Sequence, residues 1–434
     1  MNSIDILPKF IVDYLEKFSS NYWELENDNN KKFENIIVIP SIAESQFILN
    51  CLKSLEENDS EIIKNTLVIV VINNSKNSNE EIIKDNYKTF QILREYDGCL
   101  NINYIDAFSP DKSLPDKLAG VGLARKIGLD LALSKFNYES LNSKILYCLD
   151  ADCKVEKNYL KSVIFNFHKY KLKSAVIEYE HIIEDNSNES IAIVCYETFL
   201  RYLKLALTYS KSHYNYHSIG STIICDVQSY INSGGMNTKK AGEDFYFLEK
   251  LAKQNKVYTI KETLVYPSSR KSWRVPFGTG RRISNFIPFN QREYLAYNFS
   301  IFELLKEWLE FFNSEDANDT SEIISKAKKI SNELYNFLIS QNFKESWNRI
   351  LKNSTADKEL QKQKIFWFDA FRTLKLIHHL RDTIYPNSNI YDSLQILLKK
   401  MNANFDCDFN KIKSSYQLQK NLLISLRKFF RDNL

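Results

Sequence analysis

The stretch Ile145-Leu146-Tyr147-Cys148-Leu149-Asp150-Ala151-Asp152 decides the fold expected for this chain of 434 residues. Its first five residues are apolar, which is typical of a strand buried on both faces of a sheet. Two carboxylates follow directly, where the strand ends and the chain turns. Carboxylate oxygens suit Mg²⁺ and Mn²⁺ ions that also hold substrate phosphates. The pattern therefore predicts that Asp150 and Asp152 hold a divalent cation; the alternative is that both are ordinary loop residues.

Short apolar runs alternate with helical patterns through the first part of the chain. Strands are expected at 36–39, 67–72, 102–105 and 145–149, and helices at 44–55 and 118–133. Consecutive strand–helix units build a mainly parallel sheet flanked by helices, which binds ligands beyond the carboxyl ends of its strands. The expected fold class is therefore α/β.

Glycine divides the chain into two parts. All ten glycines lie between Gly98 and Gly280, and the last 154 residues (434 − 280) contain none. The absence of glycine suits helices, and the apolar spacing after residue 285 is helical. We expect a helical prefix over 1–33, an α/β domain over 34–285 and an all-α domain over 286–434. The basic, apolar helix at 416–432 either makes peripheral contact with a membrane or packs into its own bundle, as such helices more often do.

Composition excludes several classes of protein. The 58 basic and 54 acidic residues give a net charge of +4, without the concentrated basic surface of a nucleic-acid-binding protein. The seven cysteines are scattered and form no Cys-x-x-Cys pair, which favours reduced thiols in a cytoplasmic protein. Acidic residues interrupt the apolar N-terminus, and no window approaches eighteen uncharged apolar residues. We therefore expect neither a signal peptide nor a transmembrane helix.

Four motifs follow one another in the α/β part, and a fifth comes downstream. The first two strands end in Val38-Ile39-Pro40-Ser41-Ile42-Ala43-Glu44 and in Val70-Val71-Ile72-Asn73-Asn74-Ser75. A glycine-bearing loop then enters a helix and offers Lys117, Arg125 and Lys126 to phosphate or sugar. The acidic turn at Asp150 is the fourth motif. Later, Gly234-Gly235-Met236 precedes Ala241-Gly242-Glu243-Asp244, whose carboxylates either perform chemistry or cap the next helix.

Taken together, these motifs resemble those of family 2 glycosyltransferases of the GT-A fold, over roughly residues 34–250. That family typically has a strand ending in Pro-x-x-x-Glu, a second ending in Asp-Asp-x-Ser and an Ala-Arg-Asn helix. Leu-Asp-x-Asp, Gly-Gly-Phe/Met and a final Glu-Asp pair follow in that order. The resemblance implies a GT-A nucleotide-diphospho-sugar transferase fold, here with the all-α domain added after it.

The resemblance also implies roles for single residues. Asp152 would ligate Mn²⁺ or Mg²⁺, and Asp150 would contact the metal, its bound water or the ribose. Asp244 would be the general base, with Glu243 beside it. The remaining donor-side residues carried over from the family pattern are Pro40, Glu44, Asn74 and Arg125.

Two departures concern the donor. The usual Asp-Asp is Asn73-Asn74 here, which keeps hydrogen bonding but drops charge, so the selectivity for the base is open. Lys126 replaces the common Asn after Ala-Arg.

A third departure concerns the metal. No histidine lies between Asp244 and His378 to serve as a third ligand, so diphosphate and water would complete the coordination. His213 and His217 are spaced as i, i+4, and we interpret them as surface or acceptor-side residues rather than as metal ligands.

A basic segment follows the Glu-Asp pair. Residues 266–282 contain five basic residues and two glycines without apolar periodicity, so we expect a loop. Arg270 and Arg281 would bind the donor diphosphate as this loop folds over it; the alternative is a solvated linker between domains.

The expected activity is a metal-dependent, inverting sugar transfer. The donor would be a nucleotide-diphosphate sugar, and the acceptor a hydroxyl of a carbohydrate or a lipid-linked molecule. One alternative is a sugar-phosphate nucleotidyltransferase, which would release pyrophosphate instead of nucleoside diphosphate. The other is a non-catalytic, transferase-like interaction protein, which would be expected to lack Asp152 or Asp244.

Overall fold

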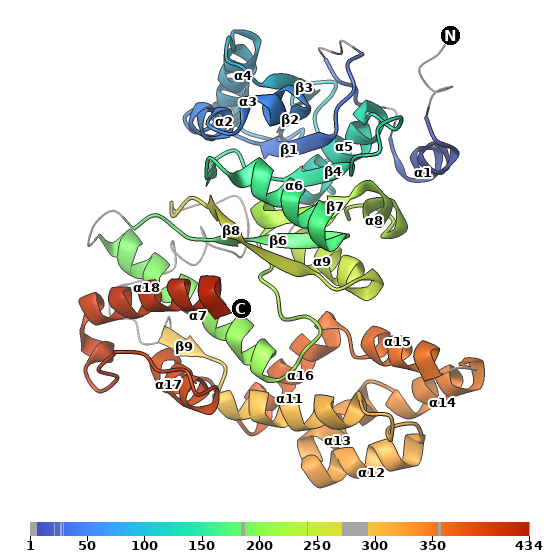
Figure 1. Ribbon diagram of the computed structural model, residues 1–434, viewed down its shortest axis with the longest axis vertical. Coiled ribbons are helices and arrows are strands. Elements are labelled where there is room, and N and C mark those ends of the chain that lie inside the picture. Colours follow the sequence, from blue (N-terminus) through green and yellow to red (C-terminus); the bar gives the residue numbers. More distant parts are fainter. Residues whose placement is uncertain are drawn as a thin grey trace. The chain divides into compact units, whose positions relative to one another are not determined.

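The computed structural model describes residues 7–20, 22–26, 28, 30–183, 187–240, 242–270, 294–354 and 357–433. The chain divides into two compact units, drawn in Figure 1. The first comprises Met1–Ile182, Ser218–Arg281 and Asn433–Leu434, and the second comprises Ile183–His217 and Arg282–Asp432. The boundary expected at residue 285 lies outside the described residues.

The first unit is built on an eight-stranded sheet with the order β3-β2-β1-β4-β7-β6-β8-β5. β1 pairs in parallel with β2 and β4, and β2 pairs in parallel with β3. β7 is antiparallel to β4 and β6, and β5 is antiparallel to β8. All four expected strands are confirmed. The strands are β1 (Asn35–Ser41), β2 (Thr66–Asn73), β3 (Asn101–Ala107), β4 (Ile145–Cys148), β5 (Lys154–Val155), β6 (Ser174–Tyr179), β7 (Ile223–Asp226) and β8 (Tyr258–Tyr266).

Helices flank this sheet, as Figure 1 shows. Short polar side chains cap several of them: Asp59 accepts from the first turn of α3 and Asn79 from that of α4. The flanking helices and the mainly parallel pairing of the strands together confirm the α/β fold class. The helices are α1 (Lys9–Phe18), α2 (Ile48–Glu56), α3 (Ser60–Lys64), α4 (Glu80–Arg94), α5 (Val121–Ala132), α6 (Tyr159–Tyr170), α8 (Val227–Asn232) and α9 (Glu243–Gln254).

α5 packs closely against the centre of the sheet. Gly128 faces β1 and β2 so tightly that a methyl group there would lie 2.4 Å from Val38 Cγ1 and 2.9 Å from Val71 Cγ2. β2 is buried along its whole length. This close approach is open only to glycine, and it fixes the position of the helix that carries Arg125.

The second unit is helical among its described residues, apart from the two-residue strands β9 (Leu295–Ala296) and β10 (Ser388–Asn389). An aromatic core, in which Trp308 stacks on Phe312 and Phe343 on Trp347, holds several helices together. The expected C-terminal helical region is therefore confirmed. The helices of the second unit are α7 (Asn188–Tyr209), α11 (Phe299–Phe312), α12 (Thr320–Ile330), α13 (Asn332–Ser340), α14 (Phe343–Asn353), α15 (Asp357–Trp367), α16 (Ala370–Thr383), α17 (Ile390–Lys400) and α18 (Tyr416–Asn433).

A buried ionic cluster joins α7 to α18. Glu197 accepts from Arg201 Nε at 2.9 Å and from Arg427 Nε and Nη2 at 2.8 and 2.6 Å. Phe430 stacks on His217, whose pKa is lowered by burial. The interpretation of His217 as a surface residue is therefore wrong.

Burial on α18 bears on its expected membrane contact. Leu422, Leu423, Leu426 and Phe430 are buried, which favours packing within the bundle. Among the residues that the structure describes, no helix is both long and apolar enough to cross a bilayer.

Candidate active site

The parallel strands β1, β2 and β4 deliver their following residues to one edge of the sheet. Glu44 comes after β1, Asn74 after β2, and Asp150 and Asp152 after β4. Carboxyl ends of neighbouring parallel strands lie together, and ligands of open α/β sheets bind there. The structure therefore brings these four predicted residues to the same edge.

Arg125 connects the acidic turn to the start of α9. It forms an ion pair with Glu243 and a second with Asp150 Oδ1 at 2.5 Å. Its side chain is only 3% exposed, whereas that of Asp150 is 36% exposed. Burial opposes the charge of Arg125, but the two carboxylates outweigh it and raise the pKa of the guanidinium. Arg125 is thus a buried, permanently charged link between two acidic motifs.

A glycine makes room for this guanidinium. A methyl group at Gly220 would lie 2.3 Å from Arg125 Nη1 and 2.5 Å from Nη2. Arg125 therefore packs directly on the backbone that precedes β7. This contact restricts the positions open to the guanidinium.

Glu243 and Asp244 form the first turn of α9. The helix is entered through Gly242, whose φ of +72° suits glycine. Asp244 Oδ1 accepts from the Phe245 amide at 2.7 Å, so the carboxylate also serves the helix terminus. Burial raises the pKa of Glu243 to about 7 against the influence of Arg125, with the charge of Asp244 adding to the rise. Burial likewise raises the pKa of Asp244.

Two glycines of the motif before Arg125 touch the loop that leads into α9. A methyl group at Gly120 would lie 2.8 Å from Lys240 Cα. One at Gly122 would lie 2.4 Å from the Lys239 carbonyl oxygen and 3.0 Å from Glu243 Cβ. These glycines therefore let the start of α5 and the Glu-Asp pair approach each other, a role distinct from phosphate binding.

Arg270 follows the end of β8 and pairs with two further carboxylates of the site, Asp152 and Glu44. Its Nε donates to Asp152 Oδ2 at 2.9 Å, and its Nη2 donates to both carboxylate oxygens of Glu44 at 2.6 Å. The guanidinium also lies 4.1 Å from the centre of the Phe47 ring. Arg281, the other predicted arginine of this segment, lies outside the described residues.

The polar ends of β1 and β2 are bound to α4. Asn74 is buried, and its Oδ1 accepts from Asn86 Nδ2 at 2.8 Å. Asn86 Oδ1 accepts from the Ala43 amide at 2.9 Å, and Asp85 accepts from Ser45. Sequence reasoning missed these two α4 residues. The sequence did contain one indication of this role: the polar Asn86 lies on the same helix face as the apolar Ile82 and Leu93. Pro40 lies within β1, one residue before its end.

The basic residues near Arg125 have other surroundings. Lys126 forms an ion pair with Asp130 Oδ2 at 2.7 Å. Tyr14 of α1 and Tyr230 of α8 both donate to Asp130 Oδ1, at 2.9 and 2.6 Å. Lys126 therefore belongs to a buried network that fastens α1 to the unit, and Lys117 is exposed.

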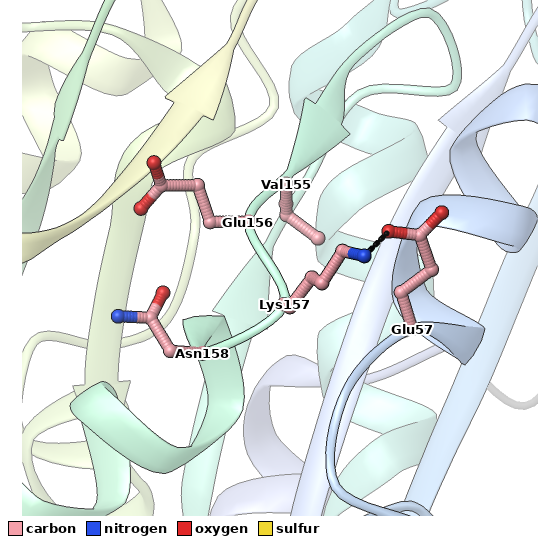
Figure 2. Close-up of a pocket in the computed structure, with 5 residues that line it drawn as sticks. All are labelled: Glu57, Val155, Glu156, Lys157 and Asn158. Atoms are coloured by element: carbon pink, nitrogen blue, oxygen red, sulfur yellow. Dashed lines mark ion pairs between the residues drawn. The ribbon is translucent and has the colours of Figure 1, made fainter.

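A shallow hollow of about 470 Å³ lies beside β5, just beyond the acidic turn (Figure 2). Figure 2 shows Lys157 directed toward Glu57, and their charged atoms are 3.6 Å apart. Glu156 and Asn158 complete the polar lining, and Val155 is its apolar member. None of the predicted site residues lines this hollow, so it is separate from the site.

The acidic turn suits a divalent cation in its donor chemistry. Asp150 pairs with Arg125 through Oδ1 and is exposed enough to offer its other oxygen, and Asp152 stands two residues on. Among the described residues no group of three or more His, Cys, Asp or Glu side chains could hold a metal ion. A hard cation held by one or two carboxylates commonly completes its shell with substrate phosphates and water. The two aspartates fit such an ion.

Comparison with known proteins finds a match between part of this chain and one protein family. Residues 36–225 match the model described as glycosyl transferase family 2. No curated protein matches the chain. Among solved structures, S. aureus TarS 1–349 in complex with UDP-GlcNAc is 14% identical, with 87% of this chain and 94% of that chain covered and a TM-score of 0.39. A mannosyltransferase from Pyrobaculum calidifontis, PcManGT in complex with GDP-Man and Mn²⁺, is 10% identical, with 97% and 94% covered and a TM-score of 0.36.

Proposed function

We propose, from the match of residues 36–225 to the family 2 glycosyltransferase model, that this region is a glycosyltransferase domain of the GT-A fold and that the chain carries out an inverting, metal-dependent sugar transfer. The donor is a nucleotide-diphosphate sugar, and the acceptor is a hydroxyl of a carbohydrate or a lipid-linked molecule. The Glu-Asp pair follows the matched range, so its part in the reaction depends on the geometry of this chain.

The observation that carries the proposal is the bridge made by Arg125. It pairs with Asp150 on one side and with Glu243 on the other. The acidic turn is thereby joined through one guanidinium to the Glu-Asp pair, whose second member, Asp244, is the candidate base. A transfer enzyme needs this juxtaposition, because the acceptor hydroxyl must be activated next to the anomeric carbon.

Each side chain then has a chemical task. Pro40 near the end of β1, Glu44 after it and Asn74 after β2 bind the nucleoside. Asp150 and Asp152 hold the cation, whose charge offsets that of the departing diphosphate. Arg270 and Arg281 add positive charge on the diphosphate side. The residues that we propose to bind the donor are Pro40, Glu44, Asn74, Arg125, Asp150, Arg270 and Arg281.

Asp244 is the better base of the acidic pair. Glu243 is committed to Arg125, whereas the described contact of the Asp244 carboxylate is one backbone amide. A pKa raised by burial brings a carboxylate nearer to the pH at which it must take a proton. One base and no covalent intermediate give inversion at the anomeric carbon.

We place this reaction in the cytoplasm. All seven cysteines are free thiols, and five of them are buried. Free thiols persist where the compartment is reducing.

The test begins with the donor. Nucleotide-diphosphate sugars are screened by thermal shift with and without Mn²⁺, since a ligand of the folded state raises its melting temperature. The donor found is then incubated with the enzyme and candidate acceptors. Release of nucleoside diphosphate supports glycosyl transfer. In a parallel incubation with the matching nucleoside triphosphate and sugar 1-phosphate, release of pyrophosphate would establish nucleotidyl transfer instead.

Asp244→Asn separates chemistry from binding. It keeps the side-chain shape but cannot take a proton, so turnover should fall by roughly 10²–10⁴-fold while donor affinity is unchanged. Glu249→Gln is the matched control, because it removes an acidic charge from the same helix at a residue paired with Lys253. Equal turnover of the two variants would eliminate Asp244 as the base.

A further inference from the structure

Arg270 is placed where a cation is expected. Its Nε donates to Asp152 at 2.9 Å, and its Nη2 lies 2.8 Å from the same carboxylate oxygen, Oδ2. Nη2 also donates to both oxygens of Glu44. One guanidinium therefore pairs with the carboxylate assigned to the metal and with a second carboxylate beside it.

The surroundings hold Arg270 in this position. The Glu44 side chain is 4% exposed and that of Asp152 is 16% exposed, so both pairs are shielded from water. Charge-assisted hydrogen bonds are stronger than neutral ones. The guanidinium also stacks on Phe47, 4.1 Å from its ring centre, which adds a cation–π attraction.

A divalent cation and Arg270 make conflicting demands on Asp152. The metal needs a lone pair of the carboxylate, while Arg270 Nε uses Oδ2 of the same group. Two positive charges on one carboxylate also repel each other. A diphosphate relieves the conflict, because its oxygens accept from a guanidinium as well as a carboxylate does.

We propose, on the basis of the function given above, that Arg270 occupies Asp152 in place of the divalent cation until donor diphosphate draws the guanidinium away. Arg270 is thus a positioning residue that couples two ligands. The metal alone binds weakly because it must displace Arg270. Metal and diphosphate together bind tightly because each removes an obstacle to the other.

The test measures the metal alone. Full-length protein is titrated with Mn²⁺, and free Mn²⁺ is followed by electron paramagnetic resonance, so neither donor nor activity is needed. Arg270→Ala should bind Mn²⁺ about tenfold more tightly or better, since at least one charge-assisted hydrogen bond no longer has to break. Phe47→Leu should bind it about two- to fivefold more tightly, as expected from the loss of one cation–π contact.

Phe47→Leu is the decisive variant because it changes no charge near the site. A simple gain of negative potential would tighten binding in Arg270→Ala alone, and that result would overturn the proposal. Phe90→Leu is the matched control: it removes a stacked arginine–phenylalanine pair, with Arg94 at 5.6 Å, on α4. Its Mn²⁺ affinity should equal that of the wild type.

Asp152→Ala distinguishes a failure of the metal assignment from a failure of the competition by Arg270. If it leaves Mn²⁺ affinity unchanged, the metal assignment in the proposed function is wrong. If it abolishes Mn²⁺ binding while Arg270→Ala and Phe47→Leu bind like the wild type, only the competition by Arg270 is wrong. Circular dichroism and melting temperature verify that each variant is folded.

Discussion

Gly122→Ala tests whether the close approach of α5 to α9 controls turnover. A methyl group at this position would lie 2.4 Å from the Lys239 carbonyl oxygen and 2.8 Å from that of Asn237. Ordinary contact begins at 3.4 Å, so the Lys239 carbonyl must retreat by 1.0 Å (3.4 − 2.4). Both obstacles are backbone atoms, and the retreating segment leads directly into Glu243.

Stability and activity should respond differently. Overpacking costs about 1–3 kcal/mol, and replacing glycine by alanine in a helix returns about 1 kcal/mol, so the net loss is about 0–2 kcal/mol. A displacement of about 1 Å at catalytic groups costs on the order of 10²-fold in rate. We therefore expect a folded enzyme with turnover reduced about 100-fold.

The assay is the release of nucleoside diphosphate, with urea denaturation measured alongside. Gly98→Ala is the overpacked control away from α5, because its methyl group would meet Tyr96 Oη at 2.3 Å, between α4 and β3. It should lose stability but keep turnover near that of the wild type. If Gly122→Ala turns over as fast as Gly98→Ala, the approach of α5 to α9 does not position the catalytic pair.

Three further predictions concern pH and stability. Burial raises the pKa of Glu243 to about 7 and also raises that of its neighbour Asp244, so turnover should rise with pH as these carboxylates lose their protons. Glu243→Gln should move this rise to lower pH, and a pH–rate profile measures it. Tyr14→Phe removes a hydroxyl that donates to buried Asp130 and should cost about 1–2 kcal/mol in urea denaturation, with the loss absent if α1 is not fastened there. Glu197→Ala takes away the carboxylate that two buried arginines share, so the helical unit should lose about 3–5 kcal/mol, whereas a loss below about 1 kcal/mol would show that the cluster is not stabilising.

The sheet was predictable because its strands are buried on both faces. Val68 to Ile72 and Ile145 to Leu149 are apolar without interruption, which is the pattern of central parallel strands. Once parallel pairing is accepted, the residues after each strand must share an edge. The expectation that Glu44 and Asp150 lie at one edge of the sheet follows from that rule alone.

Side-chain pairings could not be predicted in the same way. Arg270 is 226 residues from Glu44, and no local pattern reports so distant a partner. The glycine-bearing loop that enters a helix predicts a phosphate or sugar contact for Lys126, whereas the structure pairs Lys126 with Asp130. Its partner Asp130 stood only four residues away, but the two tyrosines that complete the network come from α1 and α8. Helical spacing likewise identified α18 as amphipathic without naming α7 as its partner.

The place of α7 in the chain has a consequence for synthesis. In the second unit α7 packs against α11 and α17. Phe299, the first residue of α11, follows Tyr209, the last of α7, by 90 residues (299 − 209). At about 5–20 residues per second a ribosome needs about 5–20 s to add them. Buried residues such as Ile193, Val194 and Leu205 must wait that long for their partners. A nascent chain thus carries an apolar helix that invites aggregation, and one that stops after residue 285 carries it permanently.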